Sequence, residues 1–307
     1  MKTMPPVPKN AATTILLREK KPFGFEIFLL KRHENSTYMA GHFVYPGGRV
    51  DREDGHPEIH SCCKGITPEE AHQILGGAIS QDESIAHWVA GIRELFEEAG
   101  VLLAYDQTGN PYNLRDSIER ERILNYRVSL QKEKMALLQL AQEEKVLFAL
   151  DQLHYYAHWI TPEAMPQRFN TRFFLVRHPT GQDASYDQKE TTAGIWLTPQ
   201  EALEGNLKGE VILSPPTLKT LENLSRFKSI EDVFNSLKKS EIRPVLPILI
   251  KISKTELLVF PWDPEYEIFQ KGEIPSPINH GRPSQPGDNS TRLIHEKGRY
   301  FPFCRSK

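Results

Sequence analysis

The sequence predicts an α/β domain that carries helical insertions and ends in a short β-rich extension. Short β-rich runs recur between residues 11 and 197, and an amphipathic helix is predicted to lie among them at 81–100. The composition changes after about residue 240. A chain of 307 residues can bury a sizeable core. We therefore expect one domain over residues 1–240 and an extension over 241–307 that packs on it.

The first strands are predicted to form a hairpin. Residues 11–17 and 26–31 are apolar and β-rich, and a Lys-Pro-Phe-Gly sequence between them is typical of a turn. A third strand at 42–45 is expected to end at Pro46, after which Gly47-Gly48 opens a loop. Two adjacent glycines let the backbone approach a ligand closely.

Two helices are predicted next, each from its own start signal. A capping box at 67–70, with Pro68 in the first helical position, starts a short helix that two glycines at 76–77 end. A second capping box at 80–83 starts a longer helix, which Gly100 ends as a C-terminal cap.

The longer helix carries three carboxylates on one face. Glu94, Glu97 and Glu98 lie at i, i+3 and i+4, and the opposite face is apolar. Three crowded anions repel one another unless a positive group lies between them. A divalent cation such as Mg²⁺ prefers carboxylate oxygens. The helix is therefore predicted to hold a metal ion; the alternative is a solvated acidic face.

Two segments carry a known motif: residues 93–101 read Arg-Glu-Leu-Phe-Glu-Glu-Ala-Gly-Val, and residues 45–51 read Tyr-Pro-Gly-Gly-Arg-Val-Asp. Together they resemble the Nudix hydrolase signature G-x5-E-x7-R-E-U-x-E-E-x-G-U, where U is a bulky aliphatic residue. The second half matches at every fixed position. In the first half Gly48 matches, Asp54 replaces the glutamate, and 38 residues (55–92) stand where the signature has seven. An insertion at this place resembles the one found in the coenzyme A diphosphatase branch of the family. Residues 42–48 and 167–174 also resemble that branch, and the whole resemblance spans roughly residues 10–225.

This resemblance implies a Nudix α/β/α sandwich with a mixed central sheet, and a diphosphatase that depends on Mg²⁺ or Mn²⁺. It implies hydrolysis of coenzyme A or an acyl-coenzyme A to adenosine 3′,5′-bisphosphate and a 4′-phosphopantetheine. Two alternatives are open: hydrolysis of ADP-ribose, NADH or another nucleoside diphosphate conjugate, and a non-catalytic module that senses such a nucleotide.

The same resemblance implies the site residues. It makes Glu94, Glu97 and Glu98 the catalytic metal ligands, with the Gly48 carbonyl and Glu190 as further ligands. Arg93 is expected to hold the helix geometry through a carboxylate, for which Asp54 is the candidate. For substrate binding, guanidinium groups suit phosphate oxygens and aromatic rings can stack on adenine. The candidates are Arg32, Arg168 and Arg172, and Tyr45, Trp159 and Phe169.

Between residues 112 and 157 the sequence predicts one or two long amphipathic helices, which could form a dimerisation arm or a lid over the substrate groove. Strands are predicted at 173–177 and 191–197, followed by a helix capped by Thr198. A further helix is predicted from Ser229 to Lys239, and a hairpin from segments 245–252 and 256–260.

Composition limits the classes of partner. A net charge of −2 gives no basic field for nucleic acid or an anionic membrane, and no apolar run is long enough to span a bilayer. Three cysteines do not make a disulfide framework, which favours a reducing compartment. We expect a soluble, cytoplasmic protein that acts on a small nucleotide, with a homodimer left open.

Overall fold

A mixed eight-stranded sheet forms the centre of the protein. The computed structural model describes residues 4–114, 116–132, 136–238, 241–252, 255–275 and 278–305. The main path runs β10-β2-β1-β9-β8-β11, with β3 paired to β2 and β4 to β1. Strand β1 pairs parallel with β9 and antiparallel with β2, so the predicted hairpin and mixed sheet are confirmed. The strand bounds are β1 Lys9–Glu19, β2 Phe25–Arg32, β3 Phe43–Val44, β4 Gly47–Arg49, β8 His154–Ile160, β9 Phe169–Arg177, β10 Thr191–Leu197 and β11 Pro244–Val245.

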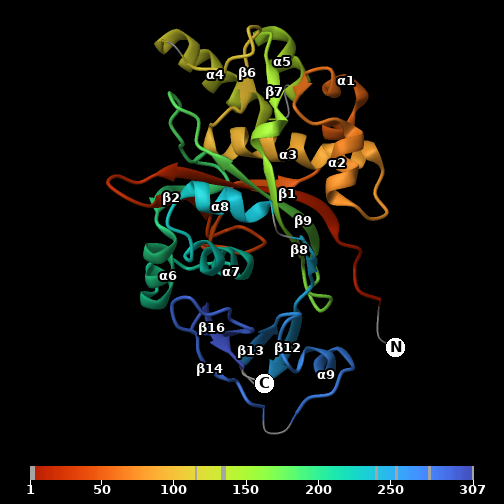
Figure 1. Cartoon of the computed structure of the whole chain (residues 1–307), viewed down its shortest axis with the longest axis vertical. Helices are drawn as coiled ribbons and strands as arrows, with labels where there is room; N and C mark the ends of the chain where they lie inside the picture. Colours follow the sequence, from red (N-terminus) through yellow and green to blue (C-terminus); the bar gives the residue numbers. More distant parts are fainter. Residues whose placement is uncertain are drawn as a thin grey trace.

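Helices cover both faces of this sheet, which confirms the predicted sandwich (Figure 1). Alternate side chains of β1 enter two different cores: Ala12 and Leu16 lie in one, Ile15 and Leu17 in the other. Helix α3 (Gln81–Ala99) packs on the first face. The second face carries α6 (Pro199–Lys208), α7 (Pro215–Leu224) and α8 (Ile230–Leu237).

Helix α3 begins and ends where the sequence predicts. Ser80 caps it through the Glu83 N–H, the side chain of Glu83 returns to the Ser80 N–H, and Gly100 ends it with a φ of 71°. The helix lies close to β1 at Gly91, whose carbonyl accepts a hydrogen bond from Thr14 Oγ1 at 2.9 Å. A Cβ at Gly91 would lie 3.2 Å from that oxygen. This contact fixes the height of the acidic end of α3 relative to the sheet.

The inserted segment precedes α3 as a compact folded-back unit. It contains η1 (Arg52–Gly55), α1 (Pro57–His60), β5 (Cys63–Lys64) and α2 (Pro68–Leu75), and α2 packs against α3. The capping box at Thr67 and the helix end at Gly76 are confirmed. The predicted loop at Gly47-Gly48 is wrong, because these residues form β4 and pair antiparallel with Thr13 and Ala12 of β1.

The region 112–157 is only partly helical. Helices α4 (Ser117–Leu130) and α5 (Leu137–Glu144) are present, but the predicted continuation to residue 156 is wrong. Lys145 ends α5 in a left-handed conformation, and the apolar residues after it enter a three-stranded sheet and then β8. That small sheet has the order β5-β7-β6, with β7 at Leu147–Ala149 and β6 at Ala104–Tyr105, and a short turn η2 (Leu150–Gln152) leads to β8.

The helix starts at Thr198 and Ser229 are confirmed, while α7 was not predicted. Helix α8 ends at Leu237, and Lys239, the predicted end, lies outside the described residues.

The C-terminal part forms its own small sheet against the second face. Its strand order is β12-β13-β15-β16-β14, and the predicted hairpin is confirmed as β12 paired with β13. Leu258, Phe260 and Leu293 join the core that contains Ile15 and Leu17, although the division of the chain at residue 240 stays a prediction. The bounds are β12 Ile248–Ile252, β13 Thr255–Val259, α9 Tyr266–Gln270, β14 Arg282–Pro283, β15 Arg292–Glu296 and β16 Arg299–Cys304.

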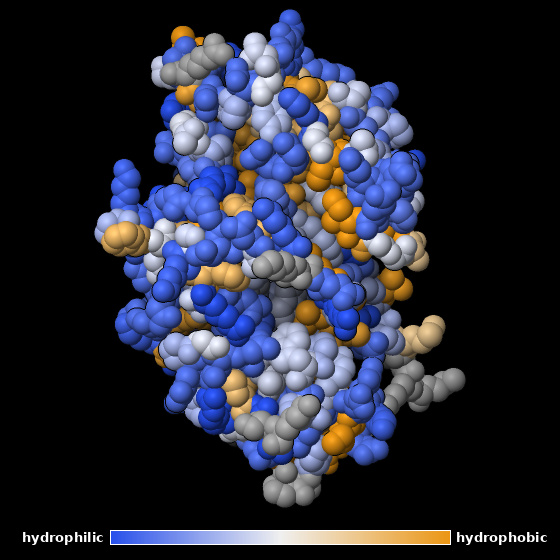
Figure 2. Space-filling model, viewed as in Figure 1, coloured by the Kyte–Doolittle hydropathy of each residue, from blue (hydrophilic) through white to orange (hydrophobic). Residues whose placement is uncertain are grey.

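The surface on the face shown in Figure 2 is mostly hydrophilic, with hydrophobic residues in patches between the hydrophilic ones. Within the part of the chain that the structure describes, the helices are all too short or too polar to cross a bilayer.

A cluster of two histidines and one arginine lies buried between α3 and the sheet. His87 and Arg172 are 0% and 4% exposed, and His158 of β8 lies beside them. Asn170 Oδ1 accepts a hydrogen bond from Arg172 Nη1 at 2.6 Å and lies 2.5 Å from His158 Nε2. Burial, together with the charge of Arg172, lowers the pKa values of both histidines to about 4. Both rings are therefore neutral in the folded protein at neutral pH.

We predict that this cluster makes folding sensitive to acid. Because the folded pKa of His158 lies below the ordinary 6.5, its stabilising contribution is complete above pH 6.5 and is lost as the pH falls towards 4. Between these pH values wild-type protein should lose about 1–3 kcal/mol more unfolding free energy than His158→Gln, measured by urea denaturation. The exposed His280 supplies the control: His280→Gln should follow wild type. Identical pH profiles for His158→Gln and wild type would contradict the prediction.

Candidate active site

The acidic residues at the end of α3 lie directly against β4. Gly47 N–H donates a hydrogen bond to Glu98 Oε2 at 2.9 Å. A Cβ at Gly48 would lie 2.4 Å from Glu94 Oε1, so a side chain at position 48 would displace that carboxylate. The paired glycines thus allow the strand to approach the helix closely.

The register of β4 decides which glycine turns its backbone polar groups towards the acids. Thr14 N–H donates to Pro46 O, and Val50 N–H to Asn10 O, so the alternate residue Gly48 also faces β1. Gly47 faces the opposite way, as its bond to Glu98 shows. The carbonyl directed towards α3 is therefore that of Gly47, whereas the Gly48 carbonyl faces the sheet.

Arg93 connects the acids to the inserted segment. Its Nε and Nη2 donate to the two oxygens of Asp54, both at 2.9 Å, and Nη2 also donates to Arg49 O at 2.8 Å. Its Nη1 donates to Glu94 Oε1 at 2.8 Å and to Glu97 Oε1 at 3.3 Å. The predicted pairing with Asp54 is confirmed, and the shorter side chain of aspartate reaches the guanidinium with both oxygens. A planar fork of this kind holds two carboxylates of α3 in fixed positions.

The carboxylates of this cluster carry more negative charge than the guanidinium of Arg93 can balance. Burial raises the pKa of Glu94 to about 7, although Arg93 opposes the shift. Burial and the charge of Glu94 raise the pKa of Glu98 well above its ordinary value, and burial also raises the pKa values of Glu97 and Asp54. Buried carboxylates need a counter-charge, which one guanidinium supplies only in part.

The donor set suits a hard dication. Glu94, Glu97 and Glu98 offer carboxylate oxygens, and Gly47 offers a carbonyl beside them. Among the described residues no three acidic, histidine or cysteine side chains converge as a preformed metal cage. Two of the three glutamates, Glu94 and Glu97, also pair with Arg93, each through its Oε1.

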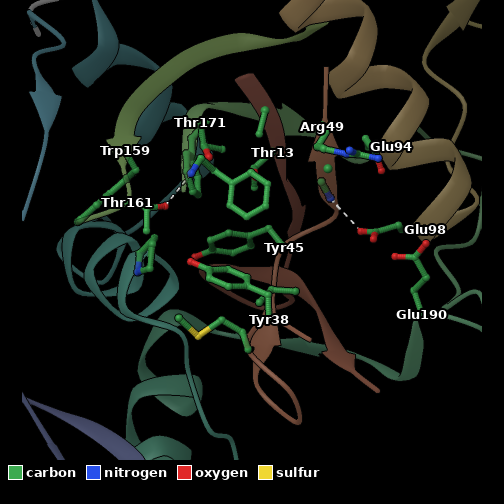
Figure 3. Close-up of a pocket in the computed structure, with 18 of the residues that line it drawn as sticks. Thr13, Tyr38, Tyr45, Arg49, Glu94, Glu98, Trp159, Thr161, Thr171 and Glu190 are labelled. Atoms are coloured by element: carbon green, nitrogen blue, oxygen red, sulfur yellow. Dashed lines mark hydrogen bonds between the residues drawn. The ribbon is translucent and has the colours of Figure 1, made fainter. Parts of the chain in front are cut away.

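Glu190 and Arg32 approach the cluster from the opposite side. Glu190 is exposed directly before β10 and its side chain points towards that of Glu98 (Figure 3). The negative charge of Glu190 contributes to the raised pKa of Glu98, whereas the positive charge of Arg32 opposes it. Both residues line the same pocket as Glu98.

A pocket of about 1260 Å³ extends from these acids across the second face of the sheet. Glu94, Glu98 and Glu190 line one end, and Tyr38 and Trp159 line the other (Figure 3). A pocket of this size exceeds the roughly 300–1,000 Å³ that is usual for a small ligand. The shape suits a long substrate with its charged group at the acidic end.

The three arginines that the sequence suggests for substrate binding are separated by the fold. Arg32 lines the pocket, and its Nε donates to Tyr38 O at 3.0 Å. Arg172 points to the opposite face of the sheet, because strand β9 alternates and Phe173 takes the pocket side. Arg168 is buried in hydrogen bonds to the carbonyls of Thr161 and Pro6.

The three predicted aromatic residues, Tyr45, Trp159 and Phe169, all line the pocket. Other lining residues were not predicted. Arg49 follows the glycine pair and lies beside Glu94, so its place next to the motif was a usable signal (Figure 3). The sequence contains no signal for the lining residues of the C-terminal extension, which are Pro247, Leu249, Leu258 and Tyr300.

Comparisons with known proteins agree on one family. The model of a family described as the NUDT19 Nudix domain matches residues 7–224. The acyl-coenzyme A diphosphatase NUDT19 of Xenopus laevis is 27% identical over 238 residues, which cover 68% of this chain and 62% of that protein. The human protein of the same name is 26% identical over 238 residues, covering 68% and 63%. The match thus spans less than two thirds of the length of these two relatives.

Among solved structures, a Nudix hydrolase from Alicyclobacillus acidocaldarius superposes with a TM-score of 0.64 at 23% identity. The superposition covers 78% of this chain and 99% of that chain, and it supports the sandwich fold described above.

Proposed function

Because the chain belongs to the Nudix hydrolase family, as the match over residues 7–224 shows, we propose that it hydrolyses the diphosphate of coenzyme A or an acyl-coenzyme A. The products would be adenosine 3′,5′-bisphosphate and a 4′-phosphopantetheine, acylated when the substrate is. The observation that carries this proposal is the pocket itself, which has buried acids at one end and an uncharged, aromatic opposite end. Its relatives named acyl-coenzyme A diphosphatase support the same substrate class.

We propose that Glu94, Glu97 and Glu98 hold Mg²⁺ or Mn²⁺ together with a backbone carbonyl, with Glu190 as a further ligand. The strand register favours Gly47 as the carbonyl donor in place of Gly48. A dication bound there neutralises diphosphate charge and lowers the pKa of bound water. Arg93 keeps the helix carboxylates in place by its hold on Asp54, which is a positioning role.

The remaining residues orient the substrate. Arg32 and Arg49 line the acidic end and can donate to phosphate oxygens there. Threonine side chains from two central strands, Thr13 and Thr171, line the middle of the pocket (Figure 3). In the reaction a water oxygen bonds to one phosphorus while the bond from that phosphorus to the bridging oxygen breaks. The proton of the water leaves to a carboxylate or to solvent, and both products depart as phosphates.

Two other functions fit this pocket less well. ADP-ribose or NADH would occupy the acidic end but would not fill the uncharged end with apolar groups. A nucleotide sensor without activity needs no catalytic acids, yet Glu94, Glu97 and Glu98 all remain at the pocket. Both observations favour a coenzyme A diphosphatase.

A substrate panel tests the proposal. Purified protein should be assayed with Mg²⁺ or Mn²⁺ on coenzyme A, acyl-coenzyme A, ADP-ribose and NADH. We expect the highest kcat/KM on a coenzyme A compound and no turnover after chelation of the metal. Higher kcat/KM on ADP-ribose or NADH would favour the second substrate class. Tight nucleotide binding without turnover on any compound would favour the sensor.

A further inference from the structure

We propose that the C-terminal sheet forms the wall against which the acyl group of the substrate lies, and that Leu249 in this wall sets the preference for acylated over free coenzyme A. This inference rests on the proposed function. It assigns a specificity role to a part of the chain outside residues 7–224, the segment that the family model matches.

The wall is built from three strands of the extension. Leu249 of β12, Leu258 of β13 and Tyr300 of β16 all line the pocket, with Pro247 at its edge. Trp159 and Phe173 of the central sheet also line it. The extension thus closes a space that the central sheet alone would leave open to solvent.

The charged lining residues of the pocket come from other parts of the chain than the wall. Its acidic and basic lining residues all lie between Arg32 and Glu98 or at Glu190. Among the described lining residues, those from 130 to 173 and from 214 to 300 carry no charged side chain. The charged end therefore suits the diphosphate, and the uncharged end suits an apolar chain that follows it.

The wall is firmly attached to the second face. Lys219 of α7, only 1% exposed, donates to Glu222 Oε2 at 2.8 Å and to the carbonyl and hydroxyl oxygens of Ser290, both at 3.1 Å. Its Nζ also lies 5.7 Å and 5.3 Å from the ring centroids of Phe260 and Trp262. A buried ammonium held by these contacts ties the extension to α7.

Two further contacts place the strands that carry the lining residues. Asn206 Nδ2 of α6 donates to Tyr300 O at 2.9 Å. The ring of Phe260, which directly follows β13, meets Trp159 edge to face with the centroids 5.9 Å apart. The pocket wall is therefore fixed relative to the sheet, and its shape can discriminate between ligands.

An apolar tail held by such a wall should improve binding with its length. Each methylene buried in the pocket tightens binding by about fourfold. We expect kcat/KM to rise along a series of saturated acyl-coenzyme A compounds until the tail fills the uncharged end. We also expect dodecanoyl-pantetheine, which lacks the diphosphate, to bind without metal more tightly than pantetheine, as isothermal titration calorimetry would show.

The variant that decides the question fills the space in front of the wall. In Leu249→Trp the ratio of kcat/KM for dodecanoyl-coenzyme A to that for coenzyme A should fall at least about tenfold, because the added ring occupies the space of the tail. Lys251→Trp adds the same ring to an exposed position of the same strand outside the pocket, and its ratio should equal that of wild type. Because Leu249→Trp could destabilise the sheet, Leu249→Ala provides a second test: its larger space should shift the preference towards bulkier acyl groups.

The outcomes separate the two proposals. If wild type hydrolyses coenzyme A but the acyl preference is unchanged in folded Leu249→Trp and Leu249→Ala, the role of the wall is overturned and the proposed function stands. If wild type hydrolyses no coenzyme A compound, the proposed function fails and the inference fails with it.

Discussion

Replacing Glu98 or Glu97 with glutamine is expected to lower kcat by at least about 100-fold without unfolding the protein. Glu98 is buried against β4, where its Oε2 accepts the Gly47 N–H. The amide oxygen of glutamine can accept the same bond, so the local structure is kept while the negative charge is lost. A lost charge weakens both cation binding and stabilisation of the transition state.

Steady-state kinetics at saturating Mg²⁺, with circular dichroism to confirm folding, would measure this effect. Glu204→Gln offers a matched control, because Glu204 is an exposed glutamate of α6 and does not line the pocket. A wild-type rate in both Glu97→Gln and Glu98→Gln would remove the metal assignment.

The second large effect concerns stability. Arg93→Met should lower the free energy of unfolding by about 3–5 kcal/mol in metal-free buffer at neutral pH. Asp54 is only 2% exposed and both of its oxygens accept from Arg93, so the variant leaves a buried carboxylate without its partner. Glu94 and Glu97 lose the same counter-charge.

Urea denaturation of Arg93→Met and Arg177→Met together would test this expectation. Arg177 also pairs with two glutamates, Glu19 and Glu231, but these pairs are exposed. Its replacement should cost no more than about 1 kcal/mol. Equal losses in the two variants would show that Arg93 is no more important than a surface arginine.

Features set by local sequence could be predicted well. The start and end of α3 depend on Ser80, Glu83 and Gly100, whose capping contacts lie within one turn of the helix end. The pairing of Arg93 with Asp54 could be expected from the spacing of a known signature, even across a long insertion. Such features need no knowledge of which distant segments meet.

Features set by distant pairing could not be predicted. Gly47 and Gly48 read as a loop because glycine disfavours strands, yet their register with β1 makes them β4 and selects the Gly47 carbonyl. From the sequence Arg172 was a reasonable candidate for binding phosphate. In the structure the pairing of β9 with β1 and β8 directs its side chain to the α3 face. The contact between Trp159 and Phe260 joins residues that are 101 positions apart in the sequence (260 − 159), and no local sequence pattern predicts it.

The most direct test of the central claim is mass analysis of the products formed from an acyl-coenzyme A in oxygen-18 water with Mg²⁺. We predict adenosine 3′,5′-bisphosphate and acyl-4′-phosphopantetheine, with one oxygen-18 atom in a phosphate of one product and no products after chelation of the metal. Intact substrate, or free coenzyme A and a fatty acid from thioester cleavage, would contradict it.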